Sequence, residues 1–231
     1  MALYDHLIPY YDAVFPLRQP VIDFLAQQFE QAGARRLLDA ACGTGTQALA
    51  LAERGFDVVG TDLHQGMIEE ARRKSQELAN PPRFEAMNMA EVDAEYFGHW
   101  DALYCIGNSF AHLTDDDQID RALSAWRDGL ASHEGRIIIQ VAHFNAVLQR
   151  GGTLPLITRE VGKKEIRFER HYERVEPGFV HFVTRLSISD GEDHQSWQDK
   201  TPLKAWTAEG LKGRLQKNGL HRLQLYGDMQ G

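Results

Sequence analysis

The stretch LLDAACGTGT, residues 37–46, joins a short apolar run to a helical pattern through two closely spaced glycines. A glycine turn between a strand and a helix lets the backbone approach a ligand closely, and the helix N-terminus favours negative charge. The dinucleotide pattern G-x-G-x-x-G is incomplete, because Gly43 and Gly45 are followed by Ala48 at the third glycine position. The stretch alone therefore indicates either a ligand-binding turn or a plain tight turn that uses two glycines.

Strand and helix patterns alternate on both sides of this turn. Short connections between such elements are typical of a doubly wound parallel sheet with helices on both faces. Strand patterns cover residues 36–41, 57–62, 83–89, 100–106 and 136–142, and helical patterns cover residues 21–33, 46–55, 66–79 and 115–130. The sequence therefore predicts an α/β, Rossmann-like fold.

The pattern changes after residue 150. Three segments, 165–175, 178–189 and 193–203, have the pattern of successive antiparallel strands separated by turn-forming residues. They predict an antiparallel β insertion, or lid, after the fifth strand of the sheet. A final helix is then expected from Thr207, and a last strand over residues 220–226.

These patterns divide the chain into four expected parts. The boundaries are 1–35 for an N-terminal helical cap, 36–150 for the cofactor-binding α/β core, 151–204 for the antiparallel lid, and 205–231 for the last helix and strand of the core.

The charge of the chain bears on its partners. The formal net charge is −8 at pH 7, whereas nucleic-acid binders usually carry a basic patch that neutralises phosphates. The nearest candidate for such a patch, Arg72 to Lys74, lies beside Glu69 and Glu70, which is typical of a solvated helix face. We therefore expect a small-molecule partner and no nucleic acid.

The sequence indicates neither a membrane span nor a metal site. No apolar run approaches the ~18 residues that span a bilayer, and the first residues lack the basic and apolar regions of a signal peptide. Cys42 and Cys105 have no Cys/His spacing around them that would indicate zinc or a disulfide framework. We expect a cytoplasmic protein with no bound metal.

Asp62 narrows the choice of ligand. It ends the second predicted strand, where doubly wound sheets place an acid against ribose hydroxyls. This position suits either NAD or S-adenosylmethionine (SAM). The alternative is that Asp62 caps the helix expected from residue 66.

Three strings resemble a known family: DAACGTGT (39–46), GTDLHQGMIEEA (60–71) and YCIGNSFAHLTD (104–115). Together they resemble the class I SAM-dependent methyltransferases, and the third string is similar to one in the glycine and glycine/sarcosine N-methyltransferases. The resemblance runs from about Tyr4 to Gly231 and is strongest over residues 37–115. It implies an enzyme that transfers the methyl group of SAM and releases S-adenosylhomocysteine.

The resemblance also implies a SAM site at the carboxyl ends of the strands, where open α/β sheets bind ligands. The residues implied around the methionine part are Asp39, Ala41, Gly43 and Gly45, with Arg18 against the SAM carboxylate. Those implied around the nucleoside are Asp62 at the ribose hydroxyls, Leu63, Met67 and Met89 at the adenine ring, and Asn88 at its amino group. Cys105, Ile106 and Gly107 would line the floor under the sulfonium. Taken singly, Met67 and Met89 could be core residues, Asn88 a turn residue and Arg18 a surface charge.

The chemistry requires little from acid–base side chains on the acceptor side. Methyl transfer from a sulfonium is an in-line displacement, so the protein mainly aligns an uncharged acceptor and excludes water. Asn108 is the candidate for contacting the acceptor, and His112 could orient the loop or take a proton, or could be structural. Tyr11 could close over the sulfonium with neighbouring tyrosines, because aromatic faces attract cations, or could belong to a hydrophobic strap. Ser109 near His112 lacks the G-x-S-x-G elbow of a hydrolase.

One departure from the relatives concerns the substrate. Where the glycine N-methyltransferases carry an arginine that holds the substrate carboxylate, this chain has Phe144, which cannot form a bidentate ion pair. We therefore expect an acceptor other than glycine, and Phe144→Arg is hypothesised to improve turnover of a small amino acid. The lid residues best able to select the acceptor are Arg167, Arg170, His171, Tyr172 and Trp197.

Three functions stay open at this point. The leading one is a SAM-dependent methyltransferase acting on a small molecule, with nitrogen as the acceptor atom. The others are a non-catalytic SAM-binding or regulatory protein and a nicotinamide-dependent dehydrogenase. Both a monomer and a homodimer are compatible with the sequence. Because class I sheets end in a further antiparallel strand that residues 1–231 do not supply, we expect a C-terminal tail of roughly 15–20 more residues.

Overall fold

The computed structural model describes residues 2–191, 193–227 and 229, which form two compact units. The parallel-sheet unit comprises Leu17–Phe110, Asp115–Val141 and Ala208–Gly231. The antiparallel-sheet unit comprises Met1–Pro16, Ala111–Thr114 and Ala142–Thr207. The predicted helical cap, residues 1–35, is thus divided between the two units.

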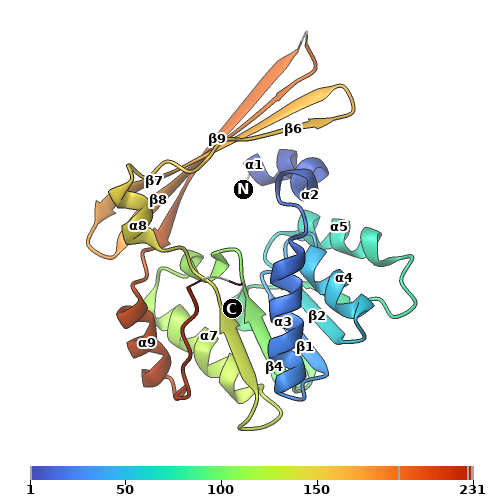
Figure 1. Ribbon diagram of the computed structural model, residues 1–231, viewed down its shortest axis with the longest axis vertical. Helices are drawn as coiled ribbons and strands as arrows, with labels where there is room; N and C mark the ends of the chain where they lie inside the picture. The colour runs from blue at the N-terminus through green and yellow to red at the C-terminus, as the bar shows by residue number, and fades with distance from the viewer. Residues whose placement is uncertain (1, 192, 228, 230–231) are drawn as a thin grey trace. The chain divides into compact units, whose positions relative to one another are not determined.

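The parallel-sheet unit contains a five-stranded sheet in the order β3-β2-β1-β4-β5 (Figure 1). All four pairings are parallel, as the alternation of strands and helices predicts, and Leu38 of β1 lies opposite Val59 of β2 and Leu103 of β4. The strands are β1 (Arg36–Ala40), β2 (Asp57–Asp62), β3 (Arg83–Ala86), β4 (Ala102–Cys105) and β5 (Arg136–Ile139). The Rossmann-like doubly wound sheet is therefore confirmed.

Short helices connect these strands. Gly33, at a φ of 65°, and Gly219, at 82°, follow the ends of the first and last helices of the unit, where the left-handed conformation favours glycine. The connecting elements are α3 (Gln19–Gln31), α4 (Thr46–Glu53), α5 (Gln65–Ser75), η2 (Met89–Glu91), α6 (Ala94–Phe97), η3 (Ser109–His112), α7 (Asp116–Asp128) and α9 (Ala208–Lys217).

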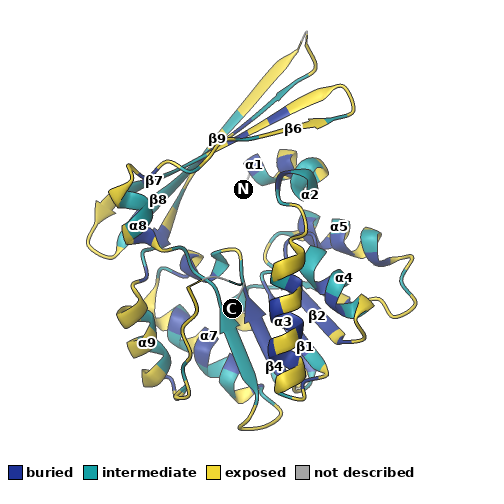
Figure 2. Ribbon diagram, viewed as in Figure 1, coloured by how far each residue is buried: buried dark blue, intermediate teal, exposed yellow. Residues whose placement is uncertain are grey.

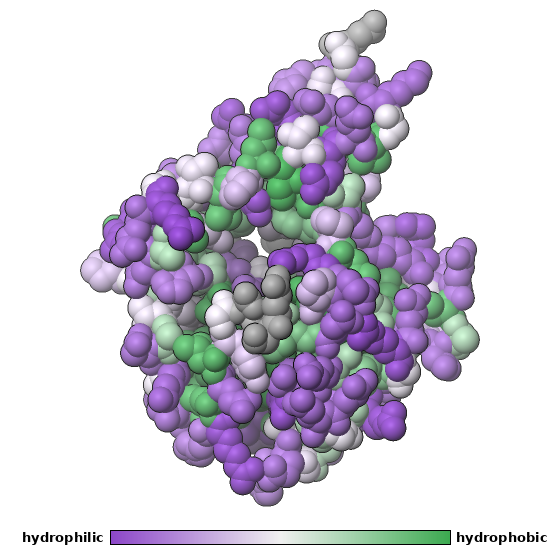
Figure 3. Space-filling model, viewed as in Figure 1, coloured by the Kyte–Doolittle hydropathy of each residue, from purple (hydrophilic) through white to green (hydrophobic). Residues whose placement is uncertain are grey.

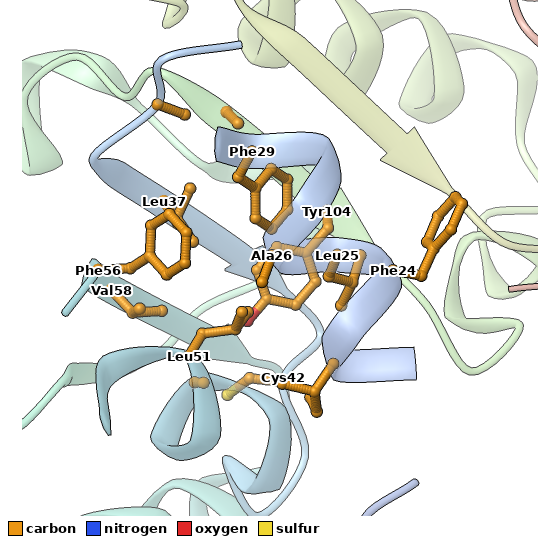
Figure 4. Packing of buried hydrophobic residues seen from close by; sticks show 14 of the residues in the cluster. Phe24, Leu25, Ala26, Phe29, Leu37, Cys42, Leu51, Phe56, Val58 and Tyr104 are labelled. Carbon is orange, nitrogen blue, oxygen red and sulfur yellow. The ribbon is translucent and has the colours of Figure 1, made fainter. Parts of the chain in front are cut away.

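The core of this unit is formed where α3 packs on the sheet (Figure 4). The Phe29 ring lies 6.0 Å from the Phe56 ring and 5.7 Å from the Tyr104 ring, measured between centroids. Leu37 of β1 and Leu51 of α4 belong to the same cluster and are fully buried. Burying a side chain of this size stabilises the fold by about 1.5–3 kcal/mol, so this cluster fixes the strand ends that follow it. The dark strands in Figure 2 show the same burial.

The antiparallel-sheet unit contains a four-stranded sheet in the order β6-β7-β8-β9. Gly178, at a φ of 86°, forms the turn between two strands of eleven or more residues that pair along most of their length, with a register shift between Arg174 and Glu176. The elements are α1 (Ala2–Leu7), η1 (Ile8–Tyr10), α2 (Tyr11–Val14), α8 (Phe144–Gln149), β6 (Ile157–Val161), β7 (Lys164–Glu176), β8 (Phe179–Ser189) and β9 (His194–Lys204). The antiparallel insertion after the fifth strand is confirmed.

The N-terminal helices pack on this second sheet. Leu3, Leu7 and Val14 are buried with Phe168 of β7 and Leu186 of β8. The His6 ring also stacks on the Trp197 ring, with centroids 3.9 Å apart. In Figure 3 the apolar side chains of this unit, drawn green, are flanked by hydrophilic ones, drawn purple.

Two expectations about strands differ from the structure. The strand predicted over residues 220–226 is wrong: this segment is irregular and belongs to neither sheet. Its alternating apolar residues are only a local signal, whereas a strand also needs a hydrogen-bonded partner. Strand β6 was not predicted, because residues 157–161 are short and rich in polar side chains. Residues 228, 230 and 231 of the predicted final part, Met1 of the cap and Glu192 of the lid lie outside the described residues.

Candidate functional site

The glycine turn after β1 has an unusual backbone. Ala41, Gly43 and Gly45 have φ angles of 70°, 56° and 75°. A positive φ is uncommon for a residue with a side chain, and outliers of this kind gather at functional sites. Gly45 is also needed for packing, because a Cβ there would come within 2.8 Å of the Phe84 ring. The turn is therefore specified by backbone geometry and by the strand beneath it.

Asp62 fastens this turn to the next one. Its Oδ2 accepts a hydrogen bond of 2.9 Å from the backbone N–H of Gly43, and its Oδ1 accepts one of 2.9 Å from the N–H of His64. A carboxylate has about four acceptor positions, so both oxygens keep a lone pair for a ligand. Asp62 thus positions two loops and can still bind hydroxyl groups. The alternative of a cap on α5 is not the observed contact, because Asp62 bonds to His64 and not to the first turn of the helix.

Asp39 lies at the end of β1 and is almost wholly buried. Only 1% of its surface is exposed, and its Oδ2 has no hydrogen-bond partner among the described residues. Burial raises the pKa of Asp39 to about 8; the Asp62 carboxylate acts in the same direction and the neighbouring Tyr104 hydroxyl opposes it. Because uncompensated buried carboxyl groups are costly, such a group points to a ligand-binding role.

The end of β4 forms a second strained turn. Gly107 and Asn108 follow one another with φ angles of 75° and 69°. Both of their backbone N–H groups donate to Oε1 of Gln140, at 2.7 and 3.1 Å. Sequence reasoning did not find Gln140; the only signal was a polar residue directly after a buried apolar strand. Gln140 therefore fixes the loop that carries Asn108.

The remaining residues implied around the nucleoside differ in exposure. The Leu63 side chain is 66% exposed, whereas Met67 is buried at 3%. Asn88 caps η2 by accepting a hydrogen bond of 3.0 Å from the N–H of Ala90 through its Oδ1. The Trp126 indole donates to the carbonyl of Met89 at 2.9 Å and so holds the residue after Asn88. Leu63 thus presents an apolar surface next to Asp62.

The parallel-sheet unit brings together most of the residues implied at the cofactor. Cys105 is fully buried, Ile106 is half-buried, and Arg18 is exposed at the start of α3. His112 and Tyr11 belong to the antiparallel-sheet unit. The Tyr11 ring lies 5.0 Å from the Phe15 ring, which in turn meets Phe168 of β7 edge-on at 5.6 Å. Tyr11 is therefore part of the aromatic packing between the N-terminal helices and the second sheet.

Phe144 is buried in the packing of its own unit. Its ring is 1% exposed and meets the Tyr172 ring edge-on at 5.3 Å. His143 accepts a hydrogen bond of 3.1 Å from the N–H of Ala146 and so caps the short helix that begins at Phe144. An arginine in this place would bury its charge among aromatic rings. The hypothesis that Phe144→Arg creates an amino-acid site is not supported by this packing.

Comparison with known proteins gives the same picture as the geometry. The family model described as "Methyltransferase domain" matches residues 37–133, which include both strained turns. The glycine/sarcosine N-methyltransferase of Halorhodospira halochloris is 26% identical over 208 residues, which are 90% of this chain and 74% of the relative. These matches support a class I SAM-dependent methyltransferase.

Other relatives of this methyltransferase share less of their length with it. The glycine/sarcosine N-methyltransferase of Parasynechococcus marenigrum is 30% identical over 73% of this chain and 58% of the relative. The human glycine N-methyltransferase is 31% identical over 54% of this chain and 46% of the relative. The chain thus spans between three quarters and about half of the length of these relatives.

Solved structures support the fold of the methyltransferase. A sugar N-methyltransferase from Streptoalloteichus has a TM-score of 0.77 at 22% identity, covering 94% of this chain and 83% of that one. A SAM-bound amino pentose methyltransferase from Micromonospora echinaspora has a TM-score of 0.73 at 20% identity, covering 90% and 87%. The match to the methyltransferase domain and the glycine/sarcosine N-methyltransferase relatives support SAM as the methyl donor. Within the described residues, no helix combines the length and the apolar character needed to cross a membrane.

Proposed function

We propose that this enzyme transfers the methyl group of SAM to a nitrogen atom of a small molecule other than glycine. The observation that carries the proposal is the glycine turn held by the Asp62 carboxylate, at the carboxyl edge of the parallel sheet. The nitrogen acceptor is supported by the names of the relatives, which include glycine/sarcosine and sugar N-methyltransferases. An acceptor other than glycine follows from Phe144, which replaces the arginine that holds the glycine carboxylate.

The roles proposed for the cofactor site follow the chemistry of SAM. The two free lone pairs of Asp62 suit the two ribose hydroxyls, and exposed Leu63 suits one face of the adenine ring. The buried carboxyl of Asp39 suits the cationic methionine part, because an opposite charge compensates a buried acid. The other proposed contacts are Arg18, Ala41, Gly43, Gly45, Met67, Asn88, Met89, Cys105, Ile106 and Gly107.

On the acceptor side, Asn108 is the proposed contact, because its backbone is fixed by Gln140 and its φ of 69° turns the chain sharply at the strand end. His112 and Tyr11 are proposed to orient or enclose the acceptor. A net charge of −8 supports a small-molecule acceptor over nucleic acid and, with the composition, a cytoplasmic location.

Methyl-labelled SAM, offered with a panel of amines, amino acids, phenols and thiols, tests the proposed function. We expect label to move to one or more amines and binding of both SAM and S-adenosylhomocysteine in calorimetric titration. Binding of NAD without SAM would overturn the proposal. Binding of SAM with no transfer to any acceptor would instead support a non-catalytic SAM-binding protein.

A further inference from the structure

The buried face of the antiparallel sheet carries a polar row between two apolar clusters. Along β7, Phe168, Arg170 and Tyr172 alternate onto the same face, because successive strand residues point to opposite sides. Phe168 is buried under the N-terminal helices, and Tyr172 is buried against α8. Between them, Arg170 lies opposite Thr184 of β8, which is also buried.

The guanidinium of Arg170 is only partly satisfied. One of its terminal nitrogens, Nη2, donates to the carbonyl of Pro155 at 2.9 Å. Its Nε is buried and makes no hydrogen bond within residues 2–191, 193–227 and 229. No carboxylate forms an ion pair with Arg170 among these same residues. Burial lowers the pKa of Arg170, and the Tyr172 phenol acts in the opposite direction.

Arg170 is half-buried, and its guanidinium keeps hydrogen-bond donors that the described residues do not use. A guanidinium offers five N–H donors in a rigid fork, and a buried donor such as Nε is unfavourable while it lacks an acceptor. A fold that needed only the bond to Pro155 could use a neutral donor. The planar fork matches the two oxygens of a carboxylate or phosphate better than any other side chain does.

We propose that Arg170 is a specificity-determining residue that binds an oxyanion, a carboxylate or a phosphate, on the methyl acceptor. This inference rests on the proposed function and names the class of acceptor: an amine that also carries an anionic group. The cation that is missing at position 144 is then supplied from β7, so anion recognition is moved within the unit and is not lost.

The substitution Arg170→Gln tests this inference, with Arg185→Gln as the matched control. Arg185 is exposed on the neighbouring strand β8, where its Nη2 donates to Oε1 of Gln198 at 3.5 Å. The acceptors are an amino acid, the corresponding amino amide and an amino sugar phosphate. We expect Arg170→Gln to raise KM for the acceptor with the matching oxyanion roughly ten- to a hundred-fold, the range expected for a charge-assisted hydrogen bond. KM for the neutral amide and the Kd for SAM should stay within about two-fold, and Arg185→Gln should leave all values unchanged.

The outcomes separate this inference from its alternatives. A selective loss on the amino acid identifies a carboxylate, and a selective loss on the sugar phosphate identifies a phosphate. An equal rise in KM for neutral and anionic acceptors would mean that Arg170 only holds the loop at Pro155. A loss of SAM affinity would mean that Arg170 binds the SAM carboxylate. Either result overturns the inference. If the unmodified enzyme methylates none of the acceptors, the proposed function fails. Calorimetric titration of the unmodified enzyme and of R170Q with acetate and with inorganic phosphate then still decides the role of Arg170. Equal binding of these anions by the two proteins would overturn the inference.

Discussion

Asp39→Asn should change the pH dependence of folding in the enzyme without ligand. The Asp39 carboxyl is buried at the end of β1, and burial raises its pKa from 3.8 to about 8. The Asp62 carboxylate on β2 also raises the pKa of Asp39, whereas the Tyr104 hydroxyl on β4 lowers it by favouring the ionised form. At pH 7 the folded enzyme therefore holds a proton on Asp39 that the unfolded chain has released.

The sign and size of the effect follow from this proton. A raised pKa in the folded state gives stability that is complete below pH 4 and is lost as the pH rises towards 8. One proton corresponds to about 1.4 kcal/mol per pH unit, so the loss reaches about 4 kcal/mol at pH 7. Asparagine cannot ionise and lacks this loss. Its amide adds a constant cost of about 1–3 kcal/mol if its new N–H groups stay unpaired, but a constant does not alter the slope.

Urea unfolding of both forms at half-unit intervals from pH 5 to 7.5 measures the difference directly. We expect the stability of D39N relative to the unmodified enzyme to increase by about 1.4 kcal/mol per pH unit. SAM, whose sulfonium is a cation, should reduce this difference, because an ionised Asp39 becomes favourable beside it. Parallel stability curves for the two forms in the absence of SAM would refute the assignment of a protonated Asp39.

Two further predictions concern the cofactor site and the substrate segment. Asp62→Ala should weaken binding of SAM, S-adenosylhomocysteine and adenosine alike by about 2–3 kcal/mol, because two hydrogen bonds to the ribose are lost. The control in the same calorimetric titration is Asp57→Ala, at the exposed opposite end of β2. Equal affinity of the Asp62 variant and this control would exclude the ribose role. Phe144→Arg should lower the free energy of unfolding by about 3–5 kcal/mol, because it removes a buried ring and buries a charge, whereas Phe144→Leu should cost less than about 1.5 kcal/mol. A stable F144R variant that methylates glycine in a labelled-SAM assay would contradict the packing argument.

The sequence predicted those parts of the fold that depend on local signals. The glycine turn, the position of Asp62 and the two long antiparallel strands each follow from neighbouring residues, through positive φ angles, strand ends and turn-forming glycines. The prediction of a strand over residues 220–226 was wrong because a strand needs a hydrogen-bonded partner, which local sequence does not specify. Gln140 escaped notice for a related reason: it holds Gly107 and Asn108 from more than thirty residues away.

Phe144 shows a different limit of sequence reasoning. The resemblance to the glycine N-methyltransferases puts Phe144 where those enzymes carry an arginine, but it could not show where the ring points. The structure places that ring against Tyr172, inside the unit. The alternation of side chains along β7 puts Arg170 on the same face as buried Tyr172 and Arg167 on the exposed face. The sequence alone could not separate the five candidate lid residues in this way, because the strand register was not known.

Each unit holds an ionisable side chain with a buried atom that makes no hydrogen bond within the described residues. In the parallel-sheet unit one such group is the acid Asp39, which carries a proton at pH 7 without ligand, and in the antiparallel-sheet unit it is the base Arg170. SAM brings a cation, and an anionic amine brings an oxyanion, so each ligand supplies the charge that one unit lacks. If the proposed roles hold, Asp39 discriminates between charged SAM and its product with an uncharged sulfur, and Arg170 discriminates between anionic and neutral amines.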